Sequence, residues 1–333
     1  MIEKGKLKYR VSLVLAVLII LEFILAGFFS IPFFGEFVSG GTGGNVTVTT
    51  YLEVGAVYPE ILNISLNYDS DITLTANSTT RVDCAALVRD YNNDTDITYA
   101  SAELFDASNS SYGAADDNND HYSNYSCSIN YNYTSPPLSW SSDDNYTAII
   151  NCTFDLEYYS NPSTWTCRME INDSTNRSDT LSANQSVLEL LALGLPDSIN
   201  YGIVNSTEVS DEQITNVTNV GNVATDLFLS GYAQSEGDGY AMNCTLGDNT
   251  AFNVYYEKYN VTSSTAGALS LTEFEATYVN LTSSPSMNQF NLNYKDDDII
   301  NGEINATYWR IYVPRDVAGT CSGNIVFGAV KDA

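Results

Sequence analysis

The chain has 333 residues, and its 41 Asp and Glu residues outnumber its 13 Lys and Arg residues, which gives a formal net charge of −28. Nucleic-acid binding requires a basic surface that neutralises phosphates, so this composition excludes that class of function. The length suffices for an N-terminal membrane segment followed by two domains of ordinary size.

An apolar run from Val11 to Phe34 is the first element predicted along the chain. A membrane-spanning helix needs about 20 apolar residues, and this run is long enough. Residues 1–10 carry clustered Lys and Arg, which stay on the cytoplasmic side of a membrane. We therefore predict a cytoplasmic basic segment over 1–10, a transmembrane anchor over 11–34 and an extracellular bulk at the cell surface. The alternatives are a cleaved secretory signal and a type IV pilin leader, which Glu22 within the run suggests.

The residues that follow have the composition of an exported protein. Residues 35–44 are Gly-rich and predict a flexible spacer. Asn-x-Ser/Thr triplets, the acceptors of N-glycosylation, occur more than twice as often as chance placement would give, all on the predicted outer side. They lie at Asn45, Asn63, Asn77, Asn93, Asn109, Asn124, Asn132, Asn145, Asn151, Asn172, Asn176, Asn184, Asn205, Asn216, Asn243, Asn260, Asn280 and Asn305. The alternative is that polar strands accumulate such triplets by accident.

From residue 45 onward, apolar and polar residues alternate, which predicts antiparallel strands with one buried face. The clearest stretches are 62–68, 72–76, 82–88, 148–158 and 165–171. Short strands separated by polar turns are typical of sandwiches, and no helical period of useful length follows residue 35. The predicted fold class is all-β, with two Ig-like antiparallel β-sandwich domains, at 45–196 and 197–333, behind the N-terminal helix. Val187 to Leu195 is predicted as a buried strand that closes the first domain.

The six cysteines are all on the predicted outer side, where disulfides form. Cys84 and Cys167 point inward in the strand phasing and suit the bridge between the sheets of an Ig-like domain. The first domain resembles an Ig-like sandwich in architecture, but Trp165 stands where antibody-type domains have a tyrosine. Phasing and domain membership predict the further pairs Cys127–Cys152 and Cys244–Cys321.

Two stretches of the second domain resemble a family of secreted β-sandwich modules. Asn216 to Val223, read as NVTNVGNV, is similar to the TVTNTGNV-like strand–turn–strand of that family, and Tyr308 to Val330 is similar to its last hairpin. Asn219, Gly221 and Asn222 would build the tight turn. Such modules occur in archaeal and bacterial surface proteins and in camelysin-like fibre subunits. The resemblance implies a β-sandwich fold and carries little about function.

No catalytic residue, cofactor-binding residue or metal ligand is assigned. His121 is the single histidine, and a Ser-His-Asp triad would have to use it; its polar surroundings predict a solvated loop residue. Asp116, Asn118 and Asp120 have D-x-N-x-D spacing, but the glycine and glutamate that an EF-hand needs further on are absent. A looser calcium site there, or at Asp296–Asp298, is the alternative to a hydrated acidic loop.

These observations predict a structural or adhesive glycoprotein of the cell surface that is not an enzyme. Its predicted partners are the membrane, other copies of itself or other surface proteins, and its role is a subunit of a surface filament or array. The alternatives are a membrane-anchored extracellular ligand-binding receptor or transporter accessory protein, and a secreted hydrolase.

The stretch Asn45 to Leu52 is β-prone and follows the spacer directly. We predict that it pairs within its own domain as the first strand. The alternative is that it completes a sheet edge of a neighbouring subunit by strand addition.

Overall fold

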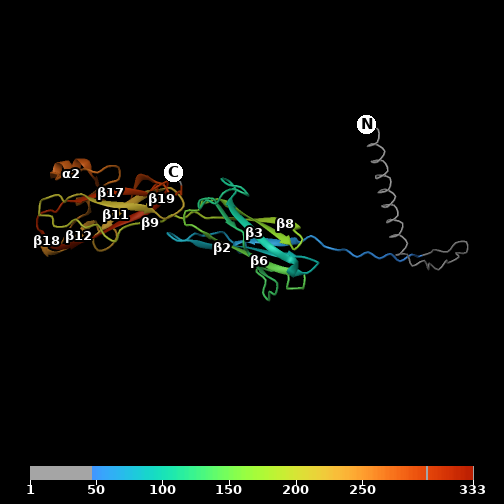
Figure 1. Ribbon diagram of the computed structural model, residues 1–333. Helices are drawn as coiled ribbons and strands as arrows, with labels where there is room; N and C mark the ends of the chain where they lie inside the picture. Colours follow the sequence, from blue (N-terminus) through green and yellow to red (C-terminus); the bar gives the residue numbers. More distant parts are fainter. Residues whose placement is uncertain (1–46, 298, 333) are drawn as a thin grey trace, which may run out of the picture. The chain divides into compact units, whose positions relative to one another are not determined.

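The computed structural model describes residues 47–297 and 299–332 (Figure 1). The predicted cytoplasmic segment, the anchor, the spacer, Asn45 and Asp298 lie outside the described residues. Among the residues that are described, no helix is long and apolar enough to cross a membrane. Gly55–Ala333 form one compact unit, apart from Met1–Val54.

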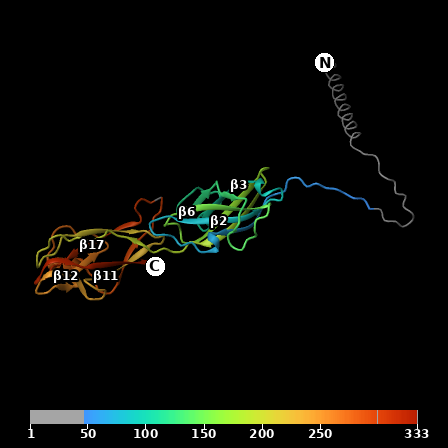
Figure 2. The same cartoon turned by 90° about the horizontal axis from the view of Figure 1, so that it is seen from below.

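The N-terminal sandwich consists of two four-stranded antiparallel sheets, and its strands form a blue-to-green group in both views (Figure 1, Figure 2). Its strands are β1 (Glu60–Leu66), β2 (Thr80–Arg89), β3 (Ile97–Asp106), β4 (His121–Asn124), β5 (Ser128–Asn130), β6 (Thr147–Leu156), β7 (Thr164–Asp173) and β8 (Ser178–Ser186). The sheets have the orders β1-β2-β6-β5 and β4-β3-β7-β8. With the strands lettered A, B, C, C′, D, E, F and G in chain order, these are A-B-E-D and C′-C-F-G, the order found in Ig-like domains.

The alternation seen in the sequence builds the core between these two sheets. On β2, Val82, Cys84, Ala86 and Val88 are fully buried, and on β7 Trp165 and the three alternate residues after it are fully buried too. A disulfide from Cys84 on β2 to Cys167 on β7 joins the sheets. A second disulfide, Cys127–Cys152, connects β6 to the chain just before β5.

The C-terminal sandwich contains three antiparallel sheets. Its strands are β9 (Leu193–Gly194), β10 (Gln213–Asn219), β11 (Thr225–Tyr232), β12 (Tyr240–Gly247), β13 (Ala251–Asn253), β14 (Glu257–Asn260), β15 (Val279–Asn280), β16 (Ser286–Leu292), β17 (Ile304–Ile311), β18 (Val317–Ser322) and β19 (Asn324–Lys331). The sheet orders are β15-β14-β17-β10-β9, β16-β11-β19 and β13-β12-β18. These orders differ from the Ig-like order of the N-terminal sandwich. The disulfide Cys244–Cys321 joins β12 to β18, so all six cysteines are paired as the strand phasing predicts.

Short helices interrupt the strands. Three are single 3₁₀ turns, η1 (Asn67–Asp69), η2 (Asp94–Asp96) and η3 (Val254–Tyr256), and one is the α-helix α2 (Leu271–Thr277). The helix α2 was not predicted, because a helix of two turns shows no sustained period in the sequence. Its N-terminus nevertheless has a readable capping box, in which the Ser270 hydroxyl accepts from the Glu273 backbone N–H.

Three predicted strands are wrong or incomplete. Residues 47–52 lie in no strand, and the first strand begins only at Glu60. The stretch 72–76 contributes one isolated parallel bridge, from Ile72 to Val187, in place of a strand. In the stretch 187–195 only Val187 is buried, and Leu193 and Gly194 pair with β10 of the C-terminal sandwich. The apolar composition of this stretch comes from leucines that remain partly exposed, which strand patterning cannot distinguish from a buried strand.

The turn from β10 to β11 is anchored by two fully buried asparagines. Asn219 Oδ1 accepts from the Gly221 N–H at 2.9 Å, and Asn219 Nδ2 donates to the Val223 carbonyl at 2.7 Å. Asn222 Nδ2 donates to the Ser160 carbonyl at 2.9 Å, and Asn222 Oδ1 accepts from the Leu190 N–H at 2.7 Å. The asparagines predicted to build this turn therefore also hold it against neighbouring backbone.

We expect Gly221→Ala to lower the melting temperature, because a Cβ at this position would lie 2.0 Å from the Leu190 carbonyl oxygen. Forcing atoms into a packed site costs about 1–3 kcal/mol, which corresponds to several degrees. Circular dichroism of the purified full-length chain on heating measures the shift. Gly55→Ala is the matched control, because no atom lies within 4 Å of its Cβ position. Equal melting temperatures for the two variants would contradict the close approach of the turn.

Candidate functional site

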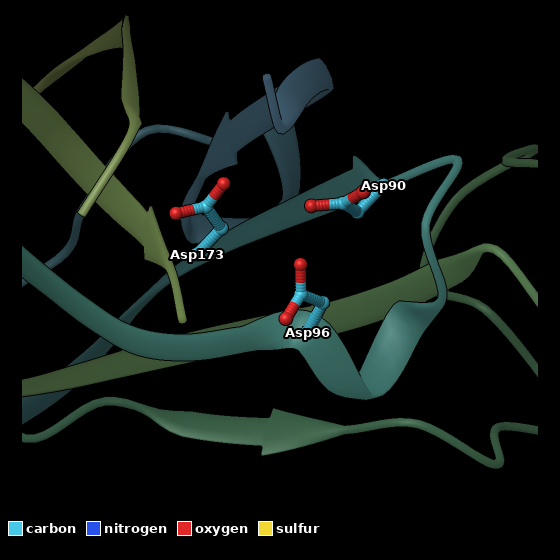
Figure 3. Close-up of side chains that lie close together, drawn as sticks. All are labelled: Asp90, Asp96 and Asp173. Atoms are coloured by element: carbon cyan, nitrogen blue, oxygen red, sulfur yellow. The ribbon is translucent and has the colours of Figure 1, made fainter. Parts of the chain in front are cut away.

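Three aspartates meet at one end of the N-terminal sandwich (Figure 3). Asp90 follows the last residue of β2, Asp96 ends η2 directly before β3, and Asp173 ends β7. One carboxylate oxygen from each lies within 4.8 Å of the other two. The arrangement follows from the topology, because β2 and β7 end where β3 begins. None of the three was singled out from the sequence, where they are separated by up to 83 residues, the spacing of Asp90 and Asp173.

Hydrogen bonds fix two of these carboxylates from the turns around them. Asp173 Oδ1 accepts from the backbone N–H groups of Thr175 and Arg177, each at 2.8 Å. Asp96 Oδ1 accepts from the Ser174 hydroxyl, and the Asp96 carbonyl accepts from the Ser174 N–H at 2.9 Å. The turn from β7 to β8 therefore holds both side chains in place.

Asp90 differs from the other two in its hydrogen bonding. Its Oδ1 accepts from the Asn92 N–H at 2.8 Å, whereas its Oδ2 is buried and has no hydrogen-bond partner among the described residues. The whole residue is 0% exposed. Figure 3 shows its carboxylate directed toward Asp96 and Asp173. Buried polar atoms are nearly always hydrogen-bonded, so an oxygen without a partner requires an explanation.

The electrostatics of the cluster differ from one carboxyl to the next. Burial raises the pKa of Asp90, and the nearby carboxylates of Asp96 and Asp173 raise it further. The Asn92 N–H and the charge of Arg177 oppose this rise. Burial also acts on Asp173, but hydrogen bonds from Arg177 and Thr175 outweigh it, so the pKa of Asp173 lies below its ordinary value. The cluster thus consists of carboxylates that repel one another. Carboxylate oxygens are the ligands that Ca²⁺ and Mg²⁺ prefer.

The prediction of a solvated loop for His121 is wrong. The residue opens β4, it is 0% exposed, and its ring stacks on Phe105 at a centroid distance of 6.0 Å. Its Nε2 lies 3.3 Å from Glu103 Oε2, and its Nδ1 lies 3.2 Å from Asp116 Oδ1. The residues around His121 in the sequence are polar, but the pairing of β3 with β4 buries its ring between carboxylates.

The acidic residues with D-x-N-x-D spacing have separate partners in the structure. Asp116 contacts His121, whereas Asn118 Nδ2 donates to Asp297 Oδ2 at 2.8 Å. Burial raises the pKa of Asp120, and the charges of Asp117 and Asp106 raise it further. Within the described residues, three potential metal-ligand atoms lie close enough to share one ion at Asp90, Asp96 and Asp173, and not in this loop. The calcium alternative at Asp116, Asn118 and Asp120 therefore gains no support, whereas the alternative at Asp296–Asp298 includes a residue outside the described part of the chain.

The C-terminal sandwich contains a cavity of about 250 Å³ with a buried carboxyl in its wall. Glu257 opens β14, and desolvation by burial raises its pKa to about 7 although the Tyr201 hydroxyl donates to its Oε1 at 2.8 Å. Other walls come from Met242 and Phe327. Pockets for drug-sized ligands measure about 300–1,000 Å³, so this cavity is small for the predicted alternative of a receptor.

The predicted glycosylation acceptors that lie within the described residues have access to solvent. None of those from Asn63 to Asn305 is buried, whereas Asn219 and Asn222, which are not acceptors, are fully buried. Four acceptors use their side-chain nitrogen in the fold. Two of them are exposed: Asn109 Nδ2 donates to Asp106 Oδ2 at 2.6 Å, and Asn205 Nδ2 donates to Glu208 Oε2 at 2.9 Å. The other two are half-buried. Asn124 Nδ2 donates to the Thr153 carbonyl at 2.9 Å, and Asn151 Nδ2 donates to Asp83 Oδ1 at 3.3 Å.

No protein-family model matches the chain, and no curated protein sequence matches it. Among solved structures, the chaperone–tip adhesin complex of CFA/I fimbriae is 8% identical over 87% of this chain and 89% of the other, with a TM-score of 0.27. The C-terminal domain of the antigen I/II polypeptide BspA of Streptococcus agalactiae is 10% identical over 79% and 91%, with a TM-score of 0.23. The corresponding domain of AspA of Streptococcus pyogenes is 12% identical over 83% and 98%, with a TM-score of 0.23. Likeness at this level supports no conclusion about function.

We expect Glu257 to make the protein less stable as the pH rises from 5 to 8. The ordinary pKa of 4.5 applies to the unfolded chain, and the folded value is about 7. The carboxyl of Glu257 binds its proton more tightly in the folded state than in the unfolded state. Its protonation therefore contributes fully to the stability of the fold below pH 4.5, and this contribution is lost as the pH rises through 7. This group alone then lowers the free energy of unfolding by about 3 kcal/mol. Urea denaturation of the wild type and of Glu257→Gln at both pH values measures the difference. Identical pH dependence in both proteins would contradict the raised pKa.

Proposed function

We propose that this chain is a membrane-anchored, N-glycosylated surface protein with a structural or adhesive role, built from an Ig-like domain and a second β-sandwich. It acts by display and association and carries out no catalysis. The anchor places the sandwiches outside the cell, and the spacer separates them from the membrane. Association with other copies gives a filament or array.

Export is supported by two independent features of the folded part. Its six cysteines are all joined in disulfides, which persist in oxidising compartments and are rare in the cytosol. Its glycosylation acceptors are all at least partly exposed in the described residues, as modification requires. An acidic coat with few basic residues keeps such a protein soluble and monodisperse until it meets a specific partner.

The observation that carries the association proposal is the exposed segment 47–54. It belongs to no strand, yet Val48 is 78% exposed and Leu52 is 88% exposed, with Tyr51 and Val54 exposed as well. Val48, Leu52 and Val54 share one face if the segment is extended, because side chains alternate with a period of two. A β-prone segment with an apolar face and no strand partner among the described residues is suited to strand addition at a sheet edge of a neighbour.

The receptor alternative has weaker support. It depends on the cavity beside Glu257, which holds about 250 Å³ and is lined by a mixture of apolar and polar residues. No second observation in the described part of the chain points to a ligand there. Display and association therefore remain the preferred function.

We expect glycopeptide mapping of the native protein to find glycans at most exposed acceptors and none at Asn151 or Asn124. Both residues are half-buried, and at both the side-chain nitrogen that would carry the sugar donates to a residue of another strand; Asn151 Oδ1 is also buried. Asn63 and Asn132, which are exposed, serve as internal controls. Absence of glycans at all acceptors would overturn the glycoprotein proposal while leaving the fold intact.

We expect Leu52→Asp to reduce self-association of the full-length protein at least tenfold without changing its melting temperature. Burying a leucine stabilises an interface by about 1.5–3 kcal/mol, and a buried aspartate cannot replace it. Because the segment is in no strand, folding should be unaffected. Cross-linking and size-exclusion chromatography in detergent measure assembly.

Thr49→Asp is the matched control, because it adds the same charge on the other face of the same segment. Equal loss in both variants would point to charge repulsion in place of strand addition. A lower melting temperature of Leu52→Asp would instead indicate that the segment pairs within its own domain as an internal strand.

A further inference from the structure

We infer that Asp90, Asp96 and Asp173 form a calcium site at the end of the N-terminal sandwich where β2 and β7 end and β3 begins. The inference goes beyond the proposed function and does not depend on it. It rests on the convergence of three carboxylates, on one buried oxygen without a partner and on the charge of the surrounding residues.

The spacing of the three carboxylates fits the ion. One oxygen from each lies within 4.8 Å of the others. Oxygens bound to Ca²⁺ lie about 2.3–2.6 Å from it, so two oxygens on one ion are separated by at most about 5 Å. Three carboxylates therefore need no rearrangement of the backbone to share one ion. Asp173 and Asp96 are already held in position by the turn from β7 to β8 through Thr175, Arg177 and Ser174.

The second observation is the state of Asp90 Oδ2. This oxygen is buried and has no hydrogen-bond partner among the described residues, although Asp90 as a whole is 0% exposed. Its carboxylate points at the other two (Figure 3). Although Asn92 donates to Oδ1, the second oxygen of this buried carboxylate faces two other carboxylates without a donor, which is a costly arrangement. A bound cation supplies the missing partner.

The charge of the site leaves room for a divalent ion. Arg177 is the cation that acts on both Asp90 and Asp173. It makes no ion pair within 4.0 Å in the described part of the chain, its Nη1 has no partner, and its guanidinium lies over the Tyr58 ring at 5.2 Å. Three carboxylates and one guanidinium leave two negative charges, which one Ca²⁺ neutralises.

An ion at this position would brace the segment that enters the sandwich. Asn92 lies between Asp90 and Asp96, its Oδ1 accepts from the Val57 N–H at 2.7 Å, and its Nδ2 donates to the Gly55 carbonyl at 3.3 Å. The loop from β2 to β3 thus connects the cluster to residues 55–57, just after the exposed segment 47–54. Calcium would order this loop and, with it, the start of the domain.

The test is calcium titration of the full-length protein in detergent after treatment with EGTA, at 150 mM NaCl. Calorimetry should show one Ca²⁺ site, and saturating Ca²⁺ should raise the melting temperature by about 5 °C. Asp90→Asn should lose that site and the thermal shift. Without calcium the same variant should melt no lower than the wild type, because it removes a buried repelling charge; this comparison excludes simple misfolding.

Asp120→Asn is the matched control, since it removes a charge from the acidic loop with D-x-N-x-D spacing and should leave the response unchanged. A calcium response that survives Asp90→Asn but is lost in Asp120→Asn would overturn the assignment. The absence of any calcium response would do the same, and an equal response to Mg²⁺ would overturn the choice of ion.

Discussion

The N-terminal sandwich depends on the buried contact between its two sheets, which the disulfide Cys84–Cys167 closes covalently. Cys84 lies on β2 and Cys167 on β7, and alternate residues on both strands are fully buried beside them. Because the side-chain period of a strand is two, a slip of one residue would expose this whole face to solvent. The contact therefore fixes the register of the central strands and, through it, the positions where each strand ends. Loops that leave those ends have little freedom in where their polar residues lie.

Buried polar groups gather at such ends, and most of them are satisfied. Asn219 and Asn222, for example, bond the backbone on both sides of a turn. Burial of a polar group is tolerated when its hydrogen bonds are made. Asp90 Oδ2 is one of several buried side-chain atoms without a hydrogen-bond partner among the described residues, and it differs from the others because it belongs to a group of three converging carboxylates. The unpartnered oxygen and the convergence of three carboxylates together point to a cation at this position.

The proposed role in display and association agrees with how the chemistry of the chain is distributed. The covalent cross-links lie inside the sandwiches, the glycosylation acceptors lie on their surfaces, and the exposed apolar side chains of residues 47–54 precede the first strand. A surface protein needs this separation, because stability against proteases and shear comes from the core while contact with partners comes from the exposed parts. Glu257 lies in the wall of the small cavity of the C-terminal sandwich, and burial raises the pKa of its carboxyl. This effect of burial requires no ligand.

The sequence by itself determined the all-β class, the long central strands and the cysteine pairs, because alternation of period two shows which side chains share a face. It could not place residues 47–52 or 72–76, since β-prone composition indicates a strand only when a partner edge is available. It also missed the short helix α2, and it assigned His121 to solvent. Only the tertiary structure reveals the acidic cluster, because Asp90 and Asp96 lie in the connection from β2 to β3, whereas Asp173 ends β7, far away in the sequence. Their convergence follows from the A-B-E-D and C′-C-F-G order, in which the ends of β2 and β7 meet the start of β3. Local patterns record which face of a strand is buried, whereas proximity between loops depends on the order and direction in which the strands pair.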